Sequence, residues 1–120
     1  PSPSPTPEPE PAPPTFREVR QGLVKTAKQA GTKIRQAQRR KKTAKPTLRQ
    51  LRRAGLRPYK GSRVTVRYAK KKRLAPHCVR ITHTKARLKR RQAVWFDSGL
   101  RKVVIGARPK GRRSACAKLF

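Results

Sequence analysis

The stretch AVWFDSGLRKVVI, residues 93–105, decides the fold, because two apolar runs flank a turn signal in it. Residues 93–96 have the character of one strand and residues 102–105 that of the next. Between them, Asp97-Ser98-Gly99 is a three-residue hairpin signal, since Asp bonds to nearby backbone and Gly accepts left-handed φ angles. We therefore predict an antiparallel hairpin, with Trp95 in the core and not stacked on a base.

Two further strands are predicted on the N-terminal side of this hairpin. In residues 62–68, and again in residues 77–84, valine, isoleucine or tyrosine alternates with arginine or threonine. A period of two is typical of a strand that is buried on one side. The KKKR run at 70–73 is expected to be a basic loop between them.

A long helix is predicted before the sheet, over about residues 16–41. Thr15 and Glu18 have the spacing of a capping box, in which side chain and backbone satisfy each other's orphan groups. Gly22 and Gly31 weaken this helix by roughly 1 kcal/mol each. Apolar residues recur at steps of three and four and form one thin stripe: Phe16, Val19, Leu23, Ala27, Ala30, Ile34 and Ala37.

A second, short helix is predicted in TLRQLRRAG, residues 47–55. Thr47 and Gln50 repeat the capping-box spacing, and Gly55 stands where a helix C-terminus favours glycine. Its buried positions are expected to be Leu48 and Leu51.

The expected fold class is therefore α+β. Residues 1–14 contain eight of the twelve prolines and should form an extended arm. Residues 15–61 are expected to be a basic helical extension. Residues 62–120 should form a small, basic, mostly antiparallel β-rich body that ends in a basic tail, and its fold is expected to depend on RNA.

The charge of the chain points to a polyanionic partner. Its 120 residues include 35 Lys and Arg but only 4 Asp and Glu, a formal charge of +31. Such one-signed charge opposes compaction, and phosphate backbones neutralise it best because binding releases counterions. An anionic membrane surface and an acidic protein are weaker alternatives. The apolar share of 33 % implies a small core, and no apolar run approaches the ~20 residues of a membrane span.

The sequence lacks the residues that a catalytic site would need. One acid follows residue 18, and Asp97 is already explained as a turn residue. His77, Cys78 and His83 lack a fourth metal ligand. GARPKGRR, residues 106–113, lacks the Lys-Ser/Thr of a phosphate loop. We expect no enzyme activity, no metal, no cofactor and no small-molecule substrate.

The two cysteines, Cys78 and Cys116, match no metal spacing. A disulfide between them is conceivable, but a small secreted scaffold would carry more cysteines. Two buried or half-buried free thiols are the favoured interpretation. The chain starts at Pro1, which is compatible with a removed targeting peptide or with a shortened sequence.

Basic residues are spread over almost every predicted element after residue 16, whereas aromatic residues are few. This favours RNA recognition by shape and backbone charge over a stacking platform for single strands. The residues expected to contact RNA are Arg35, Arg39, Arg40, Lys41, Arg52, Arg53, Arg63, Arg67, Lys70, Lys71, Lys72, Arg73, His83, Lys85, Arg87, Lys89, Arg90, Arg91, Lys110, Arg112 and Arg113.

About half the chain resembles a known family. VRITHTKARLKRRQ (79–92), AVWFDSGLRKVV (93–104) and the following ARPKGRR are similar to consecutive segments of the bacterial-type large-subunit ribosomal protein numbered twenty-eight, and SRVTVRYAKKK (62–72) would replace that family's first strand. The resemblance implies a structural role between rRNA segments, with rRNA and neighbouring ribosomal proteins as partners. It implies no homo-oligomer, no membrane, and an organellar ribosome, in a chloroplast ahead of a mitochondrion.

The main alternative is a DNA-condensing protein of the viral-core or chromatin type. Those proteins tend towards arginine runs without strands, whereas this chain has capped helices and a patterned sheet. Sedimentation of the native particle with rRNA or with DNA would separate the two. A membrane-surface protein ranks third, because the apolar helix stripe is thin and rich in alanine.

Overall fold

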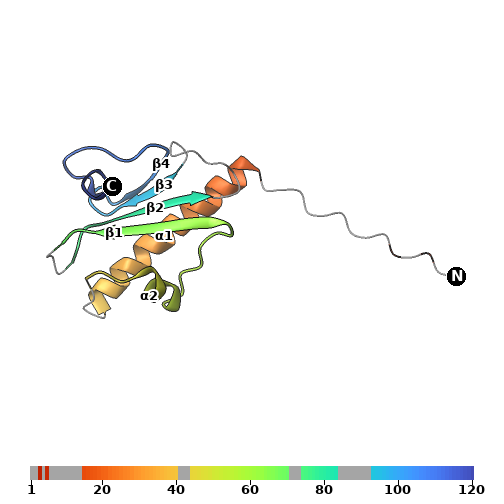
Figure 1. Cartoon of the computed structure of the whole chain (residues 1–120), viewed down its shortest axis with the longest axis horizontal. Helices are drawn as coiled ribbons and strands as arrows, with labels where there is room; N and C mark the ends of the chain where they lie inside the picture. The colour runs from red at the N-terminus through yellow and green to blue at the C-terminus, as the bar shows by residue number, and fades with distance from the viewer. Residues whose placement is uncertain (1–2, 4, 6–14, 41–43, 71–73, 84–92) are drawn as a thin grey trace.

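The computed structural model describes residues 3, 5, 15–40, 44–70, 74–83 and 93–120. It is an α+β fold, as predicted, with two helices before a four-stranded sheet (Figure 1). The predicted Pro-rich arm lies outside the described residues, except for Pro3 and Pro5. The elements in chain order are α1 (Phe16–Arg40), α2 (Leu48–Arg53), β1 (Ser62–Tyr68), β2 (His77–His83), β3 (Val94–Asp97), β4 (Lys102–Ile105) and α3 (Ala115–Leu119).

The four strands form an antiparallel meander in the order β1-β2-β3-β4. Val66 lies opposite Val79, Val79 opposite Phe96, and Phe96 opposite Val103. This apolar row crosses the whole sheet. Because side chains alternate between the faces of a strand, the next row along, Thr65, Arg80, Trp95 and Val104, points to the other face.

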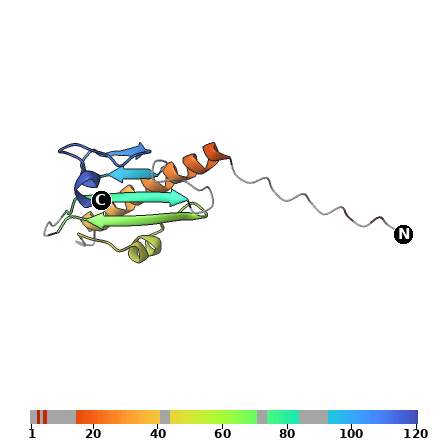
Figure 2. The same cartoon turned by 45° about the horizontal axis from the view of Figure 1, so that its top comes forward.

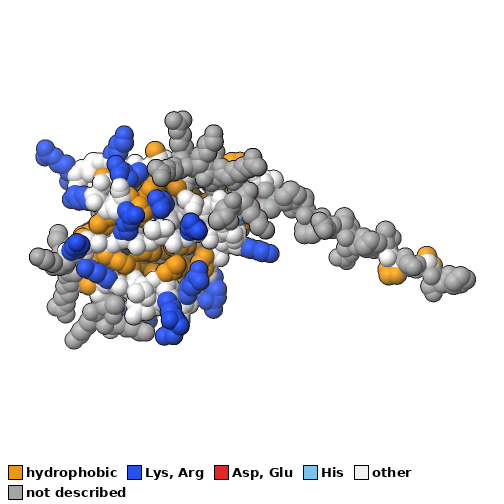
Figure 3. Space-filling model, in the orientation of Figure 1, with side chains coloured by type: hydrophobic (Ala, Val, Ile, Leu, Met, Phe, Trp, Pro, Cys, Tyr) orange, Lys and Arg blue, Asp and Glu red, His pale blue; other side chains and the backbone are white. Residues whose placement is uncertain are grey.

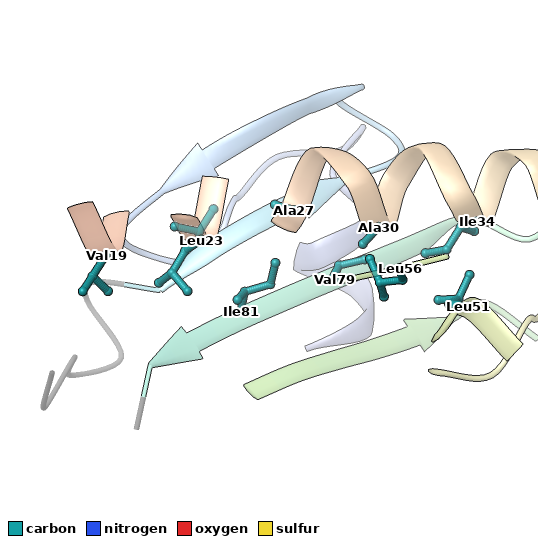
Figure 4. Packing of buried hydrophobic residues seen from close by; sticks show 10 residues of the cluster. Val19, Leu23, Ala27, Ala30, Ile34, Leu51, Leu56, Val79 and Ile81 are labelled. Carbon is teal, nitrogen blue, oxygen red and sulfur yellow. The ribbon is translucent and has the colours of Figure 1, made fainter. Parts of the chain in front are cut away.

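Helix α1 packs against the apolar face of the sheet and forms the main core. Its buried stripe meets Val79, Ile81 and Val94, and Leu51 and Leu56 close the far end (Figure 4). The stripe begins at Val19, and Phe16 is half exposed. The sequence predicts residues 15–61 to be an extension of a β-rich body. Instead they share one core with the sheet, because the alternating strands offer α1 a continuous apolar surface.

The two glycines of α1 let aromatic rings approach the helix backbone. A Cβ at Gly31 would lie 2.5 Å from Cζ of Phe96, and one at Gly22 would lie 2.3 Å from Cδ2 of Tyr59. Such distances are shorter than any van der Waals contact. The cost of glycine to helix propensity is therefore offset by close packing of both rings.

The predicted helix starts and stops are present. The Thr15 hydroxyl accepts a hydrogen bond from the Glu18 amide at 3.2 Å. At α2 both bonds of the capping box between Thr47 and Gln50 form. Gly55 follows α2 with a φ of +109°, in the left-handed region that glycine reaches without strain.

The opposite face of the sheet is covered in part by the C-terminal segment, which was predicted to be a basic tail. Exposed basic residues precede α3 in this segment, and Ser114 caps the helix. Helix α3 lies on the side of the sheet away from α1 (Figure 2). Cys116 of α3 is bonded to Cys78 of β2 in a disulfide. The prediction of two free thiols was wrong, because a separation of 38 positions hides how the chain returns over β2.

Asp97 joins the hairpin to α3. The strands end at the pair Asp97 and Lys102, so the loop is four residues long, not three, and Arg101 takes the positive φ of 56°. The Asp97 carboxylate accepts bonds from the amides of Gly99 and Leu100 in the loop. It accepts three more from α3 and its cap: the Ser114 hydroxyl and the amides of Ala115 and Cys116.

The prediction that Trp95 belongs to the core is confirmed, since its side chain is 4 % exposed. It lies on the α3 side with Cys78, Ala93 and Cys116. Its indole N–H donates to the Gly106 carbonyl at 2.8 Å, and its ring meets Phe120 edge-on with centroids 5.3 Å apart. The sheet therefore has a core on each face.

Candidate nucleic-acid interface

The surface of the described protein is basic almost everywhere. Every described Lys and Arg side chain is exposed except Lys33 and Arg80, which are half-buried. Two acids occur among the same residues: Glu18, exposed at the start of α1, and Asp97, fully buried. Figure 3 shows Lys and Arg side chains scattered across the face that carries α3.

Asp97 contributes no compensating charge to this surface. Burial disfavours its ionised form, but the hydrogen bonds from Ser114, Leu100, Ala115 and Cys116 outweigh burial and lower its pKa. The carboxylate is thus charged and fully engaged inside the fold. The exposed bases of the described residues therefore face solvent with Glu18 as their one exposed acidic counterpart.

One group of predicted RNA contacts lies on the two helices. Arg35, Arg39 and Arg40 are exposed along the last turns of α1, and Arg52 and Arg53 are exposed at the end of α2. A cleft of about 320 Å³ separates the helices. Its lining combines basic, amide and apolar side chains: Lys33, Gln36, Ala37, Arg40, Pro46, Gln50 and Ala54.

A second group lies on the sheet. Val64, Val66 and Tyr68 of β1 pack against the α1 core, so Arg63 and Arg67 point to the other face. The register sets Thr82 opposite Arg63, and Arg80 opposite Thr65. Arginine and threonine thus form a checkerboard over β1 and β2: Arg63, Thr65, Arg67, Arg80 and Thr82.

Part of this checkerboard is held by the C-terminal segment. The Arg67 guanidinium lies 4.3 Å from the Phe120 ring centroid and donates to the Leu119 carbonyl at 3.0 Å. The Arg80 guanidinium lies 5.0 Å from the same centroid. Arg108 donates to the main-chain oxygen of Phe120. The ring of Phe120 therefore orients two arginines that come from adjacent strands.

Arg80 was missed by the sequence prediction, although the signal was available. It occupies a polar position in the alternation of residues 77–84, and its neighbours Val79 and Ile81 are buried. The alternation therefore assigns Arg80 to the same face as Arg63 and Arg67. Other exposed basic residues that were missed lie in the hairpin and the C-terminal segment: Arg101, Lys102, Arg108 and Lys118.

The remaining predicted contacts are placed as follows. Lys70, Lys110, Arg112 and Arg113 are exposed. His83 is 5 % exposed, and its Nε2 lies 3.0 Å from the Lys60 carbonyl, so the structure gives it an internal partner. Outside the described residues lie Lys41, Lys71, Lys72, Arg73, Lys85, Arg87, Lys89, Arg90 and Arg91.

The described ranges show neither a cluster of metal ligands nor a helix that could span a membrane. His77 and His83 are buried on the α1 side of β2, whereas Cys78 is engaged in the disulfide on the other side. Within those ranges no three His, Cys, Asp or Glu side chains gather as metal ligands. None of the described helices has the length and apolar character needed to cross a membrane.

No protein-family model, curated protein or solved structure matches the chain. Surface charge and the placement of the arginines therefore carry the functional conclusion.

Proposed function

We propose that this protein binds RNA through the phosphate backbone, as a structural component of a ribonucleoprotein particle. The observation that carries the proposal is the surface itself: one exposed acid among the described residues, against Lys and Arg side chains on every helix and strand except β3. A polyanion neutralises such a surface and gains counterion-release entropy for each phosphate contacted. Arginine predominates on the sheet face, and its planar fork suits bidentate contact with phosphate.

The finer proposal is a constituent of the large ribosomal subunit that contacts rRNA and neighbouring ribosomal proteins. It is supported by the resemblance of residues 62–116 to the large-subunit protein numbered twenty-eight. An organellar ribosome, in a chloroplast ahead of a mitochondrion, is the location that this resemblance favours. RNA would also supply the counter-charge that the fold lacks, so we expect its thermal stability to rise when RNA is added at low salt.

The disulfide favours a second candidate, a basic protein that condenses DNA in a virion or similar particle. Disulfides persist on virions and in secreted proteins, but are rare where thiols are kept reduced. The DNA-condensing candidate explains the bond between Cys78 and Cys116 better than the RNA-binding proposal does. Alkylation of the protein directly on isolation from its native source would show whether both thiols are bonded there.

Sedimentation of the native particle tests the two candidates against each other. We expect the protein to move with large-subunit rRNA in ribosome-preserving buffer and to be released as salt is raised. Release by ribonuclease but not by deoxyribonuclease would support the proposal. Release by deoxyribonuclease alone would contradict RNA binding and support the DNA-condensing candidate. A protein that sediments free of nucleic acid, in ribosome-preserving buffer as well as at raised salt, would contradict both candidates.

A further inference from the structure

The sheet face away from α1 is divided into two halves. Helix α3 and Phe120 cover the side chains of Cys78, Trp95 and Val104 towards β3 and β4. Apart from the buried Cys78, which lies opposite Arg67, the side chains of this face on β1 and β2 are Arg63, Thr65, Arg67, Arg80 and Thr82, all exposed or half-buried. One half of this face is therefore a closed core, and the other is a polar strip two strands wide.

The three arginines of the strip are staggered. Arg80 lies opposite Thr65, so it is diagonal to both Arg63 and Arg67. Diagonal neighbours in an antiparallel pair are roughly 7–8 Å apart, whereas residues directly opposite are roughly 5 Å apart. The three positive charges thus follow a zigzag along the strip and avoid the directly opposed positions, where like charges destabilise a sheet most.

Two of the three arginines of the strip are held in place before any ligand arrives. Arg67 and Arg80 rest on the ring of Phe120, and Arg67 places one of its five N–H donors on the Leu119 carbonyl. Phe120 is itself held by its edge contact with Trp95, and the disulfide ties α3 to β2. Side chains that are already ordered lose less entropy on binding.

Neither described acid lies on this strip to neutralise it. Glu18 stands at the start of α1, on the other side of the sheet, and Asp97 is engaged by five donors. Guanidinium groups ordered in this way match a ligand with regularly repeated anionic groups. Each threonine hydroxyl beside them can donate to or accept from such a ligand.

We propose that this strip, Arg63, Thr65, Arg67, Arg80 and Thr82, binds successive phosphates along one strand of RNA, with Phe120 as the residue that positions Arg67 and Arg80. The proposal rests on the RNA-binding function proposed above and assigns its backbone-reading site. Two neighbouring strands are about 5 Å apart, so the strip is wide enough for one nucleic-acid backbone. The two arginines occupy the Phe120 ring, so the ring does not stack on a nucleotide base. Sequence preference should therefore be weak.

The test uses the full, oxidised chain and a mixed-sequence single-stranded RNA oligonucleotide, with affinity measured by fluorescence anisotropy over a range of salt. Each lost phosphate contact lowers the slope of log affinity against log salt by about 0.7 for a single strand. The triple variant Arg63→Gln, Arg67→Gln, Arg80→Gln should therefore lose about 2 from the slope. The matched control, Arg17→Gln, Arg20→Gln, Lys25→Gln on α1, removes the same charge from exposed residues outside the predicted contacts and should lose less than half as much.

Equal losses in the two triple variants would overturn the site but leave RNA binding intact. Absence of RNA binding by the unmodified chain would instead remove the proposed function. The variant with lysine at the same three sheet positions separates charge from folding: it should keep the slope of the unmodified chain and bind severalfold more weakly. A slope as low as that of the glutamine variant would contradict phosphate contact by these side chains.

Phe120→Leu tests the positioning role. It keeps an apolar side chain against Trp95 but removes the ring beneath the guanidinium groups. We expect severalfold weaker binding with an unchanged salt slope, since the charges remain. Unchanged affinity would overturn the role of Phe120. A larger effect of the glutamine triple on binding to phosphatidylserine vesicles than on RNA would assign the strip to a membrane surface and contradict the proposal.

Discussion

The two faces of the sheet are stabilised by different means. On one face, α1 lays 25 residues across the strands, and the core is aliphatic: Leu23, Ile34, Val79 and Ile81 are fully buried. On the other face, α3 has five residues and brings Cys116, Leu119 and Phe120 to Cys78 and Trp95. This second face adds a disulfide and a buried carboxylate with five donors.

Helix length explains the difference. Apolar burial contributes roughly 25 cal/mol per Å², so a long amphipathic helix is held mainly by its buried area. Polar bonds add to this at single points, such as the bond from the Gln38 amide to the Ala75 carbonyl at 3.0 Å. A helix of five residues is far below the length at which helices are stable by themselves, and it covers little area. It therefore needs directional or covalent bonds, and Asp97 and Cys78 supply both from the strands beneath it.

The largest effect is expected for Asp97→Ala. It leaves buried donors of the loop and of α3 without a partner, and each such donor costs about 1–3 kcal/mol. We expect the free energy of unfolding, measured with urea, to fall by about 5 kcal/mol. Leu23→Ala on the α1 face is the comparison and should cost about 3 kcal/mol. A loss for Asp97→Ala smaller than that for Leu23→Ala would contradict the view that polar bonds dominate the α3 face.

Reduction of the disulfide should have the next largest effect. The disulfide joins residues 38 positions apart and so restricts the unfolded chain. In the chain-entropy model this raises the free energy of unfolding by about 4 kcal/mol. We expect the melting temperature to fall on reduction, and the Trp95 fluorescence to shift as α3 detaches. The double variant Cys78→Ser, Cys116→Ser should behave like the reduced protein with or without reductant. A melting temperature unaffected by reductant would contradict a covalent contribution to this face.

A smaller effect is expected from pH, and it should distinguish the faces. Burial lowers the pKa of His77, and the positive charge of Arg35 lowers it further. The hydrogen bond between its Nδ1 and the Ala75 carbonyl raises the pKa but is outweighed. Its Nε2 is buried without a partner among the described residues, so protonation there is disfavoured. Because the unfolded state then binds the proton more readily, the stability contributed by His77 is complete above pH ~6.5 and is lost as pH falls.

Asp97 affects the free energy of unfolding at lower pH, through the same coupling of proton binding to folding. Its pKa is lowered overall, so its contribution is complete above pH ~4 and is lost as pH falls further. The free energy of unfolding should therefore decline in two separate ranges. His77→Phe should remove the upper range and leave the lower. A single decline that persists in the His77→Phe variant would contradict the assignment of the upper range to the α1 face.

The sequence predicted the elements closely where one local signal decided them. Helix α1, the capped α2 and all four strands follow from periodicity and capping residues. The prediction of a three-residue hairpin loop was wrong by one residue, because the loop length is set by the pairing of Asp97 with Lys102, which the composition of the turn does not record. Arg80 could have been found from alternation, whereas the approach of Phe120 to it could not, since 40 positions separate them.

By itself the sequence determined the charge, the α+β class and the faces of each strand, because these depend on composition and on periods of two and 3.6 residues. Only the tertiary structure decided what lies on each face. It joined the α1 stripe to the sheet, brought Cys116 to Cys78, and closed α3 over Trp95. These are contacts between residues far apart in the chain. They depend on how the chain returns over the sheet, which no short stretch of residues records.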